Sequence, residues 1–410
     1  MKRGYLSQYF EGIAMKRLSA VEVDLISSNQ HEFNGVAELR KILGDPVGKQ
    51  KFTARFLYLS DQDDEPVSDD GYLTWYDARE KGRIERGIMR WECRLYFSPN
   101  EVSRCAAEGD LLVIAKRPEE LLAIIVEKGS TIGRQIQWLF GFSDDSHPGF
   151  SVRSEMDTEQ DRIGYAARIV LEQIGLDTGS DAPSFLDRML ERFNGSFPGT
   201  REFSRFARST VENLNALEDP DKALLVWMER EEVLYRTLEK HLLGDELRGL
   251  VRKGIEEPDL FVNLVQRTLQ RRKSRVGSAL ENHLEQIFND HRLQYSREQI
   301  TENNHRPDFI FPGIDQYHNP DFPEDRLTML AAKSTCKERW RQILNEAVRI
   351  PKKHLLTLEP SISESQTNEM SYENVQLVLP RELHSTYSLS QQDRMIDIDS
   401  FLKMIFSKQI

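Results

Sequence analysis

An acid and a lysine that accompany two short apolar strands are the clearest candidates for chemistry in this sequence. Asp308, in Arg306-Pro307-Asp308-Phe309, opens one predicted strand, and Lys333, in Ala332-Lys333-Ser334, lies near the end of the next. On adjacent strands these two side chains would lie side by side. A carboxylate can hold a divalent metal that activates water, and a lysine can orient that water or stabilise charge on a phosphate. The pair therefore suits metal-dependent hydrolysis of a phosphodiester.

A second acid is expected, because one carboxylate rarely holds Mg²⁺ well. Many nucleases with this acid–lysine pattern carry the second acid two residues before the lysine. In this sequence that position is Ala331. The next candidate is Glu346, on the predicted helix that follows. Arg339 and Glu346 are seven residues apart and would share a face of that helix, so one cleft would receive both a DNA-binding group and a metal ligand.

The elements that must position these residues follow from hydrophobic periodicity. Helices are predicted at 279–291 and 337–349 and strands at 308–311, 327–333, 354–358 and 375–379, an alternation typical of an α/β domain with a central sheet. Residues 162–275 show helical spacing. The first 140 residues are rich in predicted strands, at 52–59, 90–97, 110–115 and 121–126, which indicates a small barrel or sandwich.

This pattern divides the chain into a β-rich domain, a linker and a larger second domain. The linker is placed at 146–165, where Ser, Asp, Gly and Glu are frequent. The β-rich domain is then 1–145. The second domain is 166–410, mostly helical over 166–275 and α/β over 276–410.

Composition limits the classes of protein that fit. A chain of 410 residues suggests two or three domains, and a net charge of −12 argues against a protein coated in positive potential. The three cysteines match no zinc motif and indicate reduced thiols. The N-terminus lacks the apolar core of a signal peptide, and the longest apolar run, 121–126, is too short to span a membrane. We therefore expect a cytoplasmic protein with no membrane partner.

Four segments of the sequence resemble EcoRII-type restriction endonucleases. They are Arg271-Arg272-Lys273-Ser274-Arg275, Leu280-Glu281-Asn282-His283-Leu284-Glu285, Arg306-Pro307-Asp308-Phe309-Ile310-Phe311-Pro312, and the long run from Ala332-Lys333-Ser334 to Asn345-Glu346-Ala347. The resemblance is close over 265–360, looser back to about 185 and faint in the N-terminal part. It implies a PD-(D/E)XK nuclease core that uses Mg²⁺.

The resemblance also implies roles for single residues. Asp308 and Glu346 match metal ligands, the second acid being displaced from the strand to the helix in this family, and Lys333 matches the catalytic lysine. Glu281 matches a further acid of the site, and Tyr317 matches a tyrosine near it. Other readings stay open: Ser278 and Glu281 can form a capping box, as can Thr335 and Glu338, and Tyr317 can be a packed aromatic.

Two basic segments are candidates for DNA contact. Lys337-Glu338-Arg339 resembles the family's element that reads cytosine–guanine pairs. Arginine or lysine donates to guanine O6 and N7, and a carboxylate accepts from the cytosine amino group. The alternative is an exposed, charged helix start. The second segment suits phosphate contact, or is a solvated basic turn, and comprises Arg271, Arg272, Lys273 and Arg275.

The N-terminal domain faintly resembles the family's effector-binding domain, a DNA-binding pseudobarrel. The resemblance rests on Lys16-Arg17-Leu18-Ser19 and on Ser27-Ser28-Asn29-Gln30-His31. The residues expected at DNA are Lys16, Arg17, Asn29, Gln30, His31, Arg90 and Trp91. Trp75, Tyr76 and Trp91 can instead line a pocket for an extruded base, or pack in the core. Because the sequence diverges here, the ligand can differ from the family's, and a modified base is one candidate.

The sequence as a whole indicates a Mg²⁺-dependent, site-specific endonuclease acting on double-stranded DNA at a short site containing cytosine and guanine. The N-terminal domain would bind DNA as an effector or specificity element. Cutting both strands of a palindrome-like site suggests a homodimer, and no nucleotide cofactor is expected. Two alternatives are a modification-dependent nuclease that reads methylcytosine and a catalytically silent DNA-binding protein.

Overall fold

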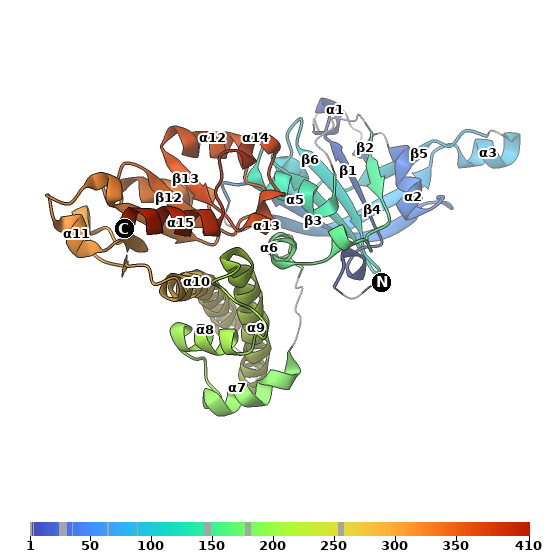
Figure 1. The fold of residues 1–410 in the computed structure, drawn as a ribbon. Coiled ribbons are helices and arrows are strands. Elements are labelled where there is room, and N and C mark those ends of the chain that lie inside the picture. Colours follow the sequence, from blue (N-terminus) through green and yellow to red (C-terminus); the bar gives the residue numbers. More distant parts are fainter. Residues whose placement is uncertain are drawn as a thin grey trace. The chain divides into compact units, whose positions relative to one another are not determined.

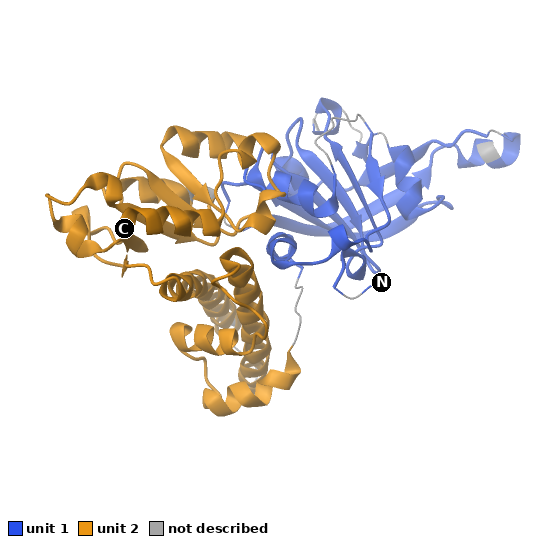
Figure 2. Ribbon diagram, viewed as in Figure 1, with its two compact units in different colours: residues 1–176, 361–363 blue, residues 177–360, 364–410 orange. Residues whose placement is uncertain are grey.

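The computed structural model (Figure 1) describes the chain except for residues 1, 3, 24–30, 35, 64, 88, 143–148, 177–181 and 253–257. The side chains of residues 83, 252, 258, 337 and 338 are also outside the description. Two compact units are present (Figure 2): unit 1 is 1–176 with 361–363, and unit 2 is 177–360 with 364–410. No helix among the described residues has the length and apolar character needed to cross a bilayer.

Unit 1 is built on one mixed sheet of eight strands. In spatial order the strands are β2-β5-β4-β3-β7-β6-β1-β8, and only β3 and β7 pair in parallel. Over the described residues the strands form one sheet with β2 and β8 as its outer strands, so the predicted sandwich of two sheets is wrong. The strands are β1 (Gly12–Arg17), β2 (Glu32–Phe33), β3 (Gln50–Leu59), β4 (Val67–Asp77), β5 (Cys93–Phe97), β6 (Leu111–Lys116), β7 (Leu121–Val126) and β8 (Ser151–Arg153).

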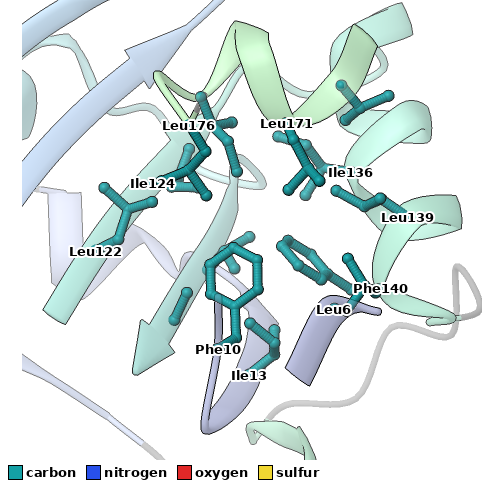
Figure 3. Close-up of a cluster of buried hydrophobic side chains, with 14 of the residues drawn as sticks. Leu6, Phe10, Ile13, Leu122, Ile124, Ile136, Leu139, Phe140, Leu171 and Leu176 are labelled. Carbon is teal, nitrogen blue, oxygen red and sulfur yellow. The ribbon is translucent and has the colours of Figure 1, made fainter. Parts of the chain in front are cut away.

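Both faces of this sheet bury apolar side chains. Along β7, Leu122, Ile124 and Val126 enter one cluster (Figure 3), and the alternate residues enter another. A strand covered on both faces is a continuous apolar run, as this one is. The helices of unit 1 are η1 (Leu6–Gln8), α1 (Ala20–Val23), η2 (Val36–Leu39), α2 (Arg40–Leu43), α3 (Glu80–Arg86), α4 (Glu101–Cys105), α5 (Thr131–Phe140), η3 (Glu159–Asp161) and α6 (Tyr165–Gln173).

The described part of the predicted linker belongs to unit 1. Strand β8 pairs with β1, Phe150 and Met156 are buried in the two clusters, and α6 adds Val170 and Leu171 to one of them. The polar composition of this segment reflects its exposed residues, while its few apolar residues hold it to the sheet. The boundary between the units therefore falls after Leu176, later than the sequence indicated.

Unit 2 combines long helices with a five-stranded sheet, ordered β13-β12-β11-β10-β9. Strands β11, β12 and β13 are parallel, and β10 is antiparallel to its neighbours. Its helical part comprises η4 (Pro183–Phe185), α7 (Leu186–Arg192), α8 (Thr200–Ser209), α9 (Pro220–Arg252) and α10 (Pro258–Asp290). The strands are β9 (Ser296–Arg297), β10 (Phe309–Phe311), β11 (Thr328–Lys333), β12 (Lys353–Thr357) and β13 (Val375–Val378).

Shorter elements and a C-terminal helix complete unit 2. They are η5 (Glu302–Asn304), α11 (Ile314–His318), η6 (Glu324–Arg326), η7 (Lys337–Asn345), α12 (Glu364–Tyr372), α13 (Arg381–His384), α14 (Leu389–Gln392) and α15 (Ile398–Gln409). Aromatic side chains seat two helices on the sheet. Phe288 of α10 packs edge-on against Phe309 and Phe311, at ring distances of 5.0 and 5.2 Å, and Phe401 of α15 packs against Phe311.

The four strands predicted in the α/β region are present within a residue or two of their expected ends, and the helical middle segment is confirmed. Two helices differ from expectation. The helix predicted at 279–291 is the last part of the 33-residue α10. The helix predicted at 337–349 is a 3₁₀ helix that ends at Asn345.

Candidate active site

Asp308 and Lys333 lie side by side, as the sequence predicts. Antiparallel pairing of β10 with β11 sets Phe309 opposite Leu330 and brings the residue before β10 close to the end of β11. Lys333 Nζ lies 2.9 Å from Asp308 Oδ2, and the backbone N–H of Ala332 donates to the same oxygen at 2.7 Å. The Asp308 carboxylate is thus held by two donors from β11.

Glu346 faces this pair from the segment that follows η7. Burial raises the pKa of Glu346 to about 7; the Lys333 charge opposes this rise and the Asp308 charge adds to it. Its Oε2 atom is buried and has no hydrogen-bond partner among the described residues. A buried carboxylate oxygen without a donor, beside another carboxylate, is a place where a cation would be stabilised.

Lys333 balances these acids. Burial lowers its pKa, but the carboxylates of Asp308, Glu346 and Glu281 reverse the effect, so the net pKa is raised and the ammonium stays protonated. Glu281 belongs to the same electrostatic group: burial and the Asp308 charge raise its pKa. Its Oε2 atom accepts a bond from Arg297 Nη2 at 2.7 Å.

The structure decides the capping alternatives. Ser278 lies inside α10 and not at a helix start, so a capping box with Glu281 is wrong. Helix η7 begins after Cys336 without a side-chain cap, so Thr335 does not cap it either. The buried carboxylate of Glu359 accepts from the Cys336 backbone N–H instead.

Arg339 and Glu346 do not share a helix face. A 3₁₀ helix has three residues per turn, so residues seven apart point in different directions. Glu346 also lies beyond the last residue of η7, in extended backbone with φ −83° and ψ 145°. Glu346 therefore reaches the site from a loop and Arg339 is exposed on the helix.

Tyr317 is a packed aromatic whose hydroxyl group is engaged. It is buried on α11, and its hydroxyl donates to the carboxylate of Glu302, with distances of 2.7 and 2.6 Å to the two oxygens. Burial raises the pKa of Tyr317 beyond its usual value. Glu302 also accepts from the backbone N–H of Val348 at 3.3 Å. Tyr317 therefore supports the segment after Glu346.

The basic segment at 271–275 is largely engaged within unit 2. Arg272 pairs with the buried Glu239 at 2.6 Å, and Arg271 lies over the Phe197 ring at 4.0 Å. Arg275 is buried, donates to the Pro198 carbonyl at 2.9 Å and lies over Tyr235, which does not fit contact with phosphate. Lys273 is exposed. The side chains of Lys337 and Glu338 lie outside the described residues.

Some of the N-terminal residues predicted to contact DNA are also buried or bonded within unit 1. Lys16 is buried, and its ammonium binds the Glu22 carboxylate at 2.7 and 2.9 Å, so the expectation that it contacts DNA is wrong. Arg17 is half-buried and lies 3.4 Å from the Gly109 carbonyl. Half-buried His31 meets Tyr96 and Phe97 edge-on. Asn29 and Gln30 lie outside the described residues.

The aromatic trio does not form one open pocket. Trp75 is fully buried and donates Nε1–H to the Gly44 carbonyl at 3.0 Å, which is a core role. Half-buried Tyr76 donates to Glu32 at 2.5 Å. Trp91 is half-buried beneath Arg40, while Arg90 is exposed.

Sequence reasoning missed one ionisable group beside the site, Lys353. It is only 4% exposed at the start of β12, where burial lowers its pKa to about 8. The one available signal was a lysine placed directly before the apolar run His354-Leu355-Leu356.

The donor set fits a hard divalent cation. Among the described residues no three acidic, histidine or cysteine side chains converge as a metal cluster. Mg²⁺ does not need one, because it keeps several waters and is commonly bound by one or two carboxylates. The carboxylates of Asp308 and Glu346 meet that requirement, because the Oε2 atom of Glu346 has no hydrogen-bond partner among the described residues.

Over half of its length or less, the chain is homologous to type II restriction enzymes. The family model described as EcoRII C terminal matches residues 235–402. The chain is 42% identical over 209 residues to the type II restriction enzyme EcoRII of Escherichia coli, covering 50% of each chain. It is 27% identical over 163 residues to the type II restriction enzyme SsoII of Shigella sonnei, covering 36% of this chain and 51% of that enzyme.

Solved structures of two further restriction endonucleases resemble the chain more distantly. Metal-depleted Ecl18kI in complex with uncleaved DNA aligns with a TM-score of 0.47 at 19% identity, covering 55% of this chain and 84% of that one. A PspGI–substrate DNA complex aligns with a TM-score of 0.40 at 13% identity, covering 56% and 93%. The chain spans about half the length of the curated relatives it matches.

Proposed function

We propose that this protein is a Mg²⁺-dependent, site-specific endonuclease that hydrolyses phosphodiester bonds of double-stranded DNA at a short site containing cytosine and guanine. The observation that carries the proposal is the contact of Lys333 with Asp308 at 2.9 Å, with Glu346 in electrostatic reach of both. The homology of this part of the chain to restriction enzymes supports the same reading.

Each residue of the proposed site would have a distinct role in hydrolysis. Bound Mg²⁺ would supply an activated water and neutralise the scissile phosphate. Asp308 and ionised Glu346 would hold the cation, and the two donors on Asp308 Oδ2 fix the direction of that carboxylate. Protonated Lys333 would stabilise negative charge as water oxygen bonds to phosphorus and the bond from phosphorus to the leaving sugar oxygen breaks.

Plasmid cleavage tests this function. Purified protein with Mg²⁺ is expected to cut unmethylated plasmid into discrete fragments, and Lys333→Ala is expected to leave the plasmid intact. Cleavage of methylated plasmid alone would favour the modification-dependent nuclease. Binding without cutting on every substrate would favour a silent DNA-binding protein. Sequencing the fragment ends then gives the recognition site.

Arg339 is proposed to read a guanine of the site. It is exposed on η7, close in sequence to Lys333. Replacing Arg339 with alanine is expected to cost about 1–3 kcal/mol of discrimination, because a bidentate contact to guanine O6 and N7 is lost. The measurement is relative cleavage of the site and of single-base variants. Equal losses on all sequences would instead indicate a phosphate contact.

We also propose that unit 1 binds DNA, as an effector or specificity element of pseudobarrel type. The proposal is supported by the sequence resemblance over Lys16 to Ser19 and by the strand-rich architecture of unit 1. Arg90, whose side chain is exposed, is the candidate that we test for DNA contact. A second duplex added in trans should stimulate cleavage by the full-length protein. Loss of that stimulation in Arg90→Ala, with basal cleavage retained, would assign the contact.

A homodimer is proposed from an exposed apolar surface on the two long helices. On α10, Phe261, Val265 and Leu269 recur at helical spacing, and all three are exposed. Large exposed apolar patches commonly mark protein interfaces, and two active sites are needed to cut two strands. The occupant proposed for this surface is therefore a second copy of the chain. Leu247, Val251, Leu260 and Val262 are also exposed on these two helices.

Charge placed on this surface should separate the copies. Val265→Asp is expected to shift the protein from dimer to monomer mass in sedimentation, and to convert double-strand cuts into nicks or no cleavage. Leu389→Asp, at an exposed leucine on α14, is the matched control and should leave the mass unchanged. A monomeric parent protein, or a dimeric Val265→Asp variant, would contradict the assignment.

A further inference from the structure

A buried lysine on β12 holds the backbone of the segment that carries Glu346. Lys353 Nζ donates to the carbonyl oxygens of Glu346, Ala347 and Ile350, at 2.5, 2.8 and 2.7 Å. An ammonium has three N–H donors, so all of them are used on this one turn of chain. The lysine is 4% exposed and sits on the strand next to β11, paired with Met329.

This turn would not be expected to keep its shape unaided. Ala347 has a φ of +46°, in the left-handed region that non-glycine residues rarely adopt. Carbonyl groups at the end of a helix also lack intrahelical donors. On its other side, Val348 N–H is bound by Glu302, whose carboxylate is fixed in turn by Tyr317. The turn is therefore held by side chains on two sides.

The direction of the Glu346 side chain depends on that backbone. Its Oε2 atom has no hydrogen-bond partner among the described residues, so no hydrogen bond from them orients that oxygen toward Asp308. If the ammonium were removed, the three carbonyls would each lose a donor, the Ala347 carbonyl keeping only the Ile350 backbone N–H, and Ala347 would be held less firmly in the left-handed region. The carboxylate would then swing away from its place beside Asp308.

We propose that Lys353 is a positioning residue that sets Glu346 as a metal ligand by clamping the turn from Glu346 to Ile350. The inference rests on the proposed function, because it takes Glu346 to bind the divalent cation. Lys353 acts through the backbone, because its ammonium donates to the carbonyls of Glu346, Ala347 and Ile350. Its loss should therefore weaken metal binding and leave DNA binding without metal unchanged.

The test uses Lys353→Met in the full-length protein. Mn²⁺ binding to the protein–DNA complex is followed by electron paramagnetic resonance of the free ion, and Mg²⁺ dependence is measured from cleavage rates. Both half-saturating concentrations are expected to rise roughly 10- to 100-fold, as when a support of a metal ligand is lost. Cleavage should largely recover at high Mg²⁺, and metal-free DNA binding should equal that of the parent.

Lys408→Met is the matched control. Lys408 Nζ lies 3.5 Å from the Leu327 carbonyl oxygen and 3.0 Å from Thr328 Oγ1. These oxygens are at the start of β11, whereas Lys333 is at its other end. It is expected to lower stability without changing the Mn²⁺ or Mg²⁺ requirement. If Lys353→Met does not fold, as judged by circular dichroism, Lys353→Gln is used, whose shorter amide reaches fewer carbonyls.

The outcomes separate this inference from the proposed function. A folded Lys353 variant with parental Mn²⁺ affinity overturns the clamp, even if the parent cuts DNA. A parent that binds Mn²⁺ but cuts no DNA overturns the proposed nuclease, while a weakened Mn²⁺ affinity in the variant still supports the clamp. A parent that neither binds Mn²⁺ nor cuts overturns both.

Discussion

Asp308→Asn is expected to lower the single-turnover rate of DNA cleavage by roughly 10³-fold or more while DNA binding without metal is retained, because the cation loses an anionic ligand and the phosphate loses a bound Mg²⁺. The amide oxygen can still accept the bonds that Ala332 N–H and Lys333 Nζ now donate to Oδ2. The fold around the site should therefore persist. Rates are measured with protein in excess over a duplex that contains the site.

Asp315→Asn is the matched control for this change. Asp315 is an exposed carboxylate on α11 of the same unit, and its amide variant is expected to cut at the parental rate. Mobility-shift titrations in EDTA should give equal DNA affinity for the parent and for both variants. Cleavage by Asp308→Asn at a rate near that of the parent would remove Asp308 from the site.

Glu346→Gln is expected to have two opposite effects, loss of cleavage and a gain of stability in the absence of metal. The pKa of Glu346 is raised from 4.5 to about 7 by burial, with Asp308 adding to the rise and Lys333 and Lys353 opposing it. The protonated acid therefore stabilises the fold fully below pH 4.5, and this contribution is lost as pH rises through 7. Glutamine stays neutral, so the variant keeps that stability.

The gain should appear only at high pH. The difference in free energy of unfolding is expected to be near zero at pH 4 and to reach about 1–3 kcal/mol at pH 8, a range that allows for solvent screening of a partly exposed group. Urea unfolding in EDTA at both pH values measures it. Added Mg²⁺ should stabilise the parent at pH 8 and not the variant. Glu373→Gln, at an exposed position after α12, should match the parent throughout. Identical unfolding curves for Glu346→Gln and the parent would mean that Glu346 is solvated.

The central contact of the site was predictable from the sequence. Asp308 directly precedes β10 and Lys333 is the last residue of β11, and strands that follow one another in the chain tend to pair in space. The apolar runs also identified β3, β5, β6 and β7 of the first sheet and β10 to β13 of the second, but not the remaining strands. The periodicity of apolar residues predicts which side chains are buried, because that pattern is local in the sequence.

The partner of each charged or polar side chain was decided by the tertiary structure alone. Lys16 is buried against Glu22, Arg275 lies among aromatic rings, and Lys353 binds the turn after η7. In the sequence these residues look like any exposed basic residue. A charge is stable in the interior only where other elements bring donors or acceptors to it, and periodicity says nothing about such contacts.

The same reason accounts for the local elements that differed. Ser278 looked like a helix start, but the upstream residues continue α10 through it. Glu346 was placed on a helix face, but the helix is 3₁₀ and ends one residue earlier. Its carboxylate interacts electrostatically with Asp308 from a turn whose carbonyls accept from Lys353. The sequence predicted the contact between Asp308 and Lys333 in the candidate site and the two strands that bring them together. Only the packed structure decided how Glu346 arrives there, because that depends on buried hydrogen bonds between distant segments.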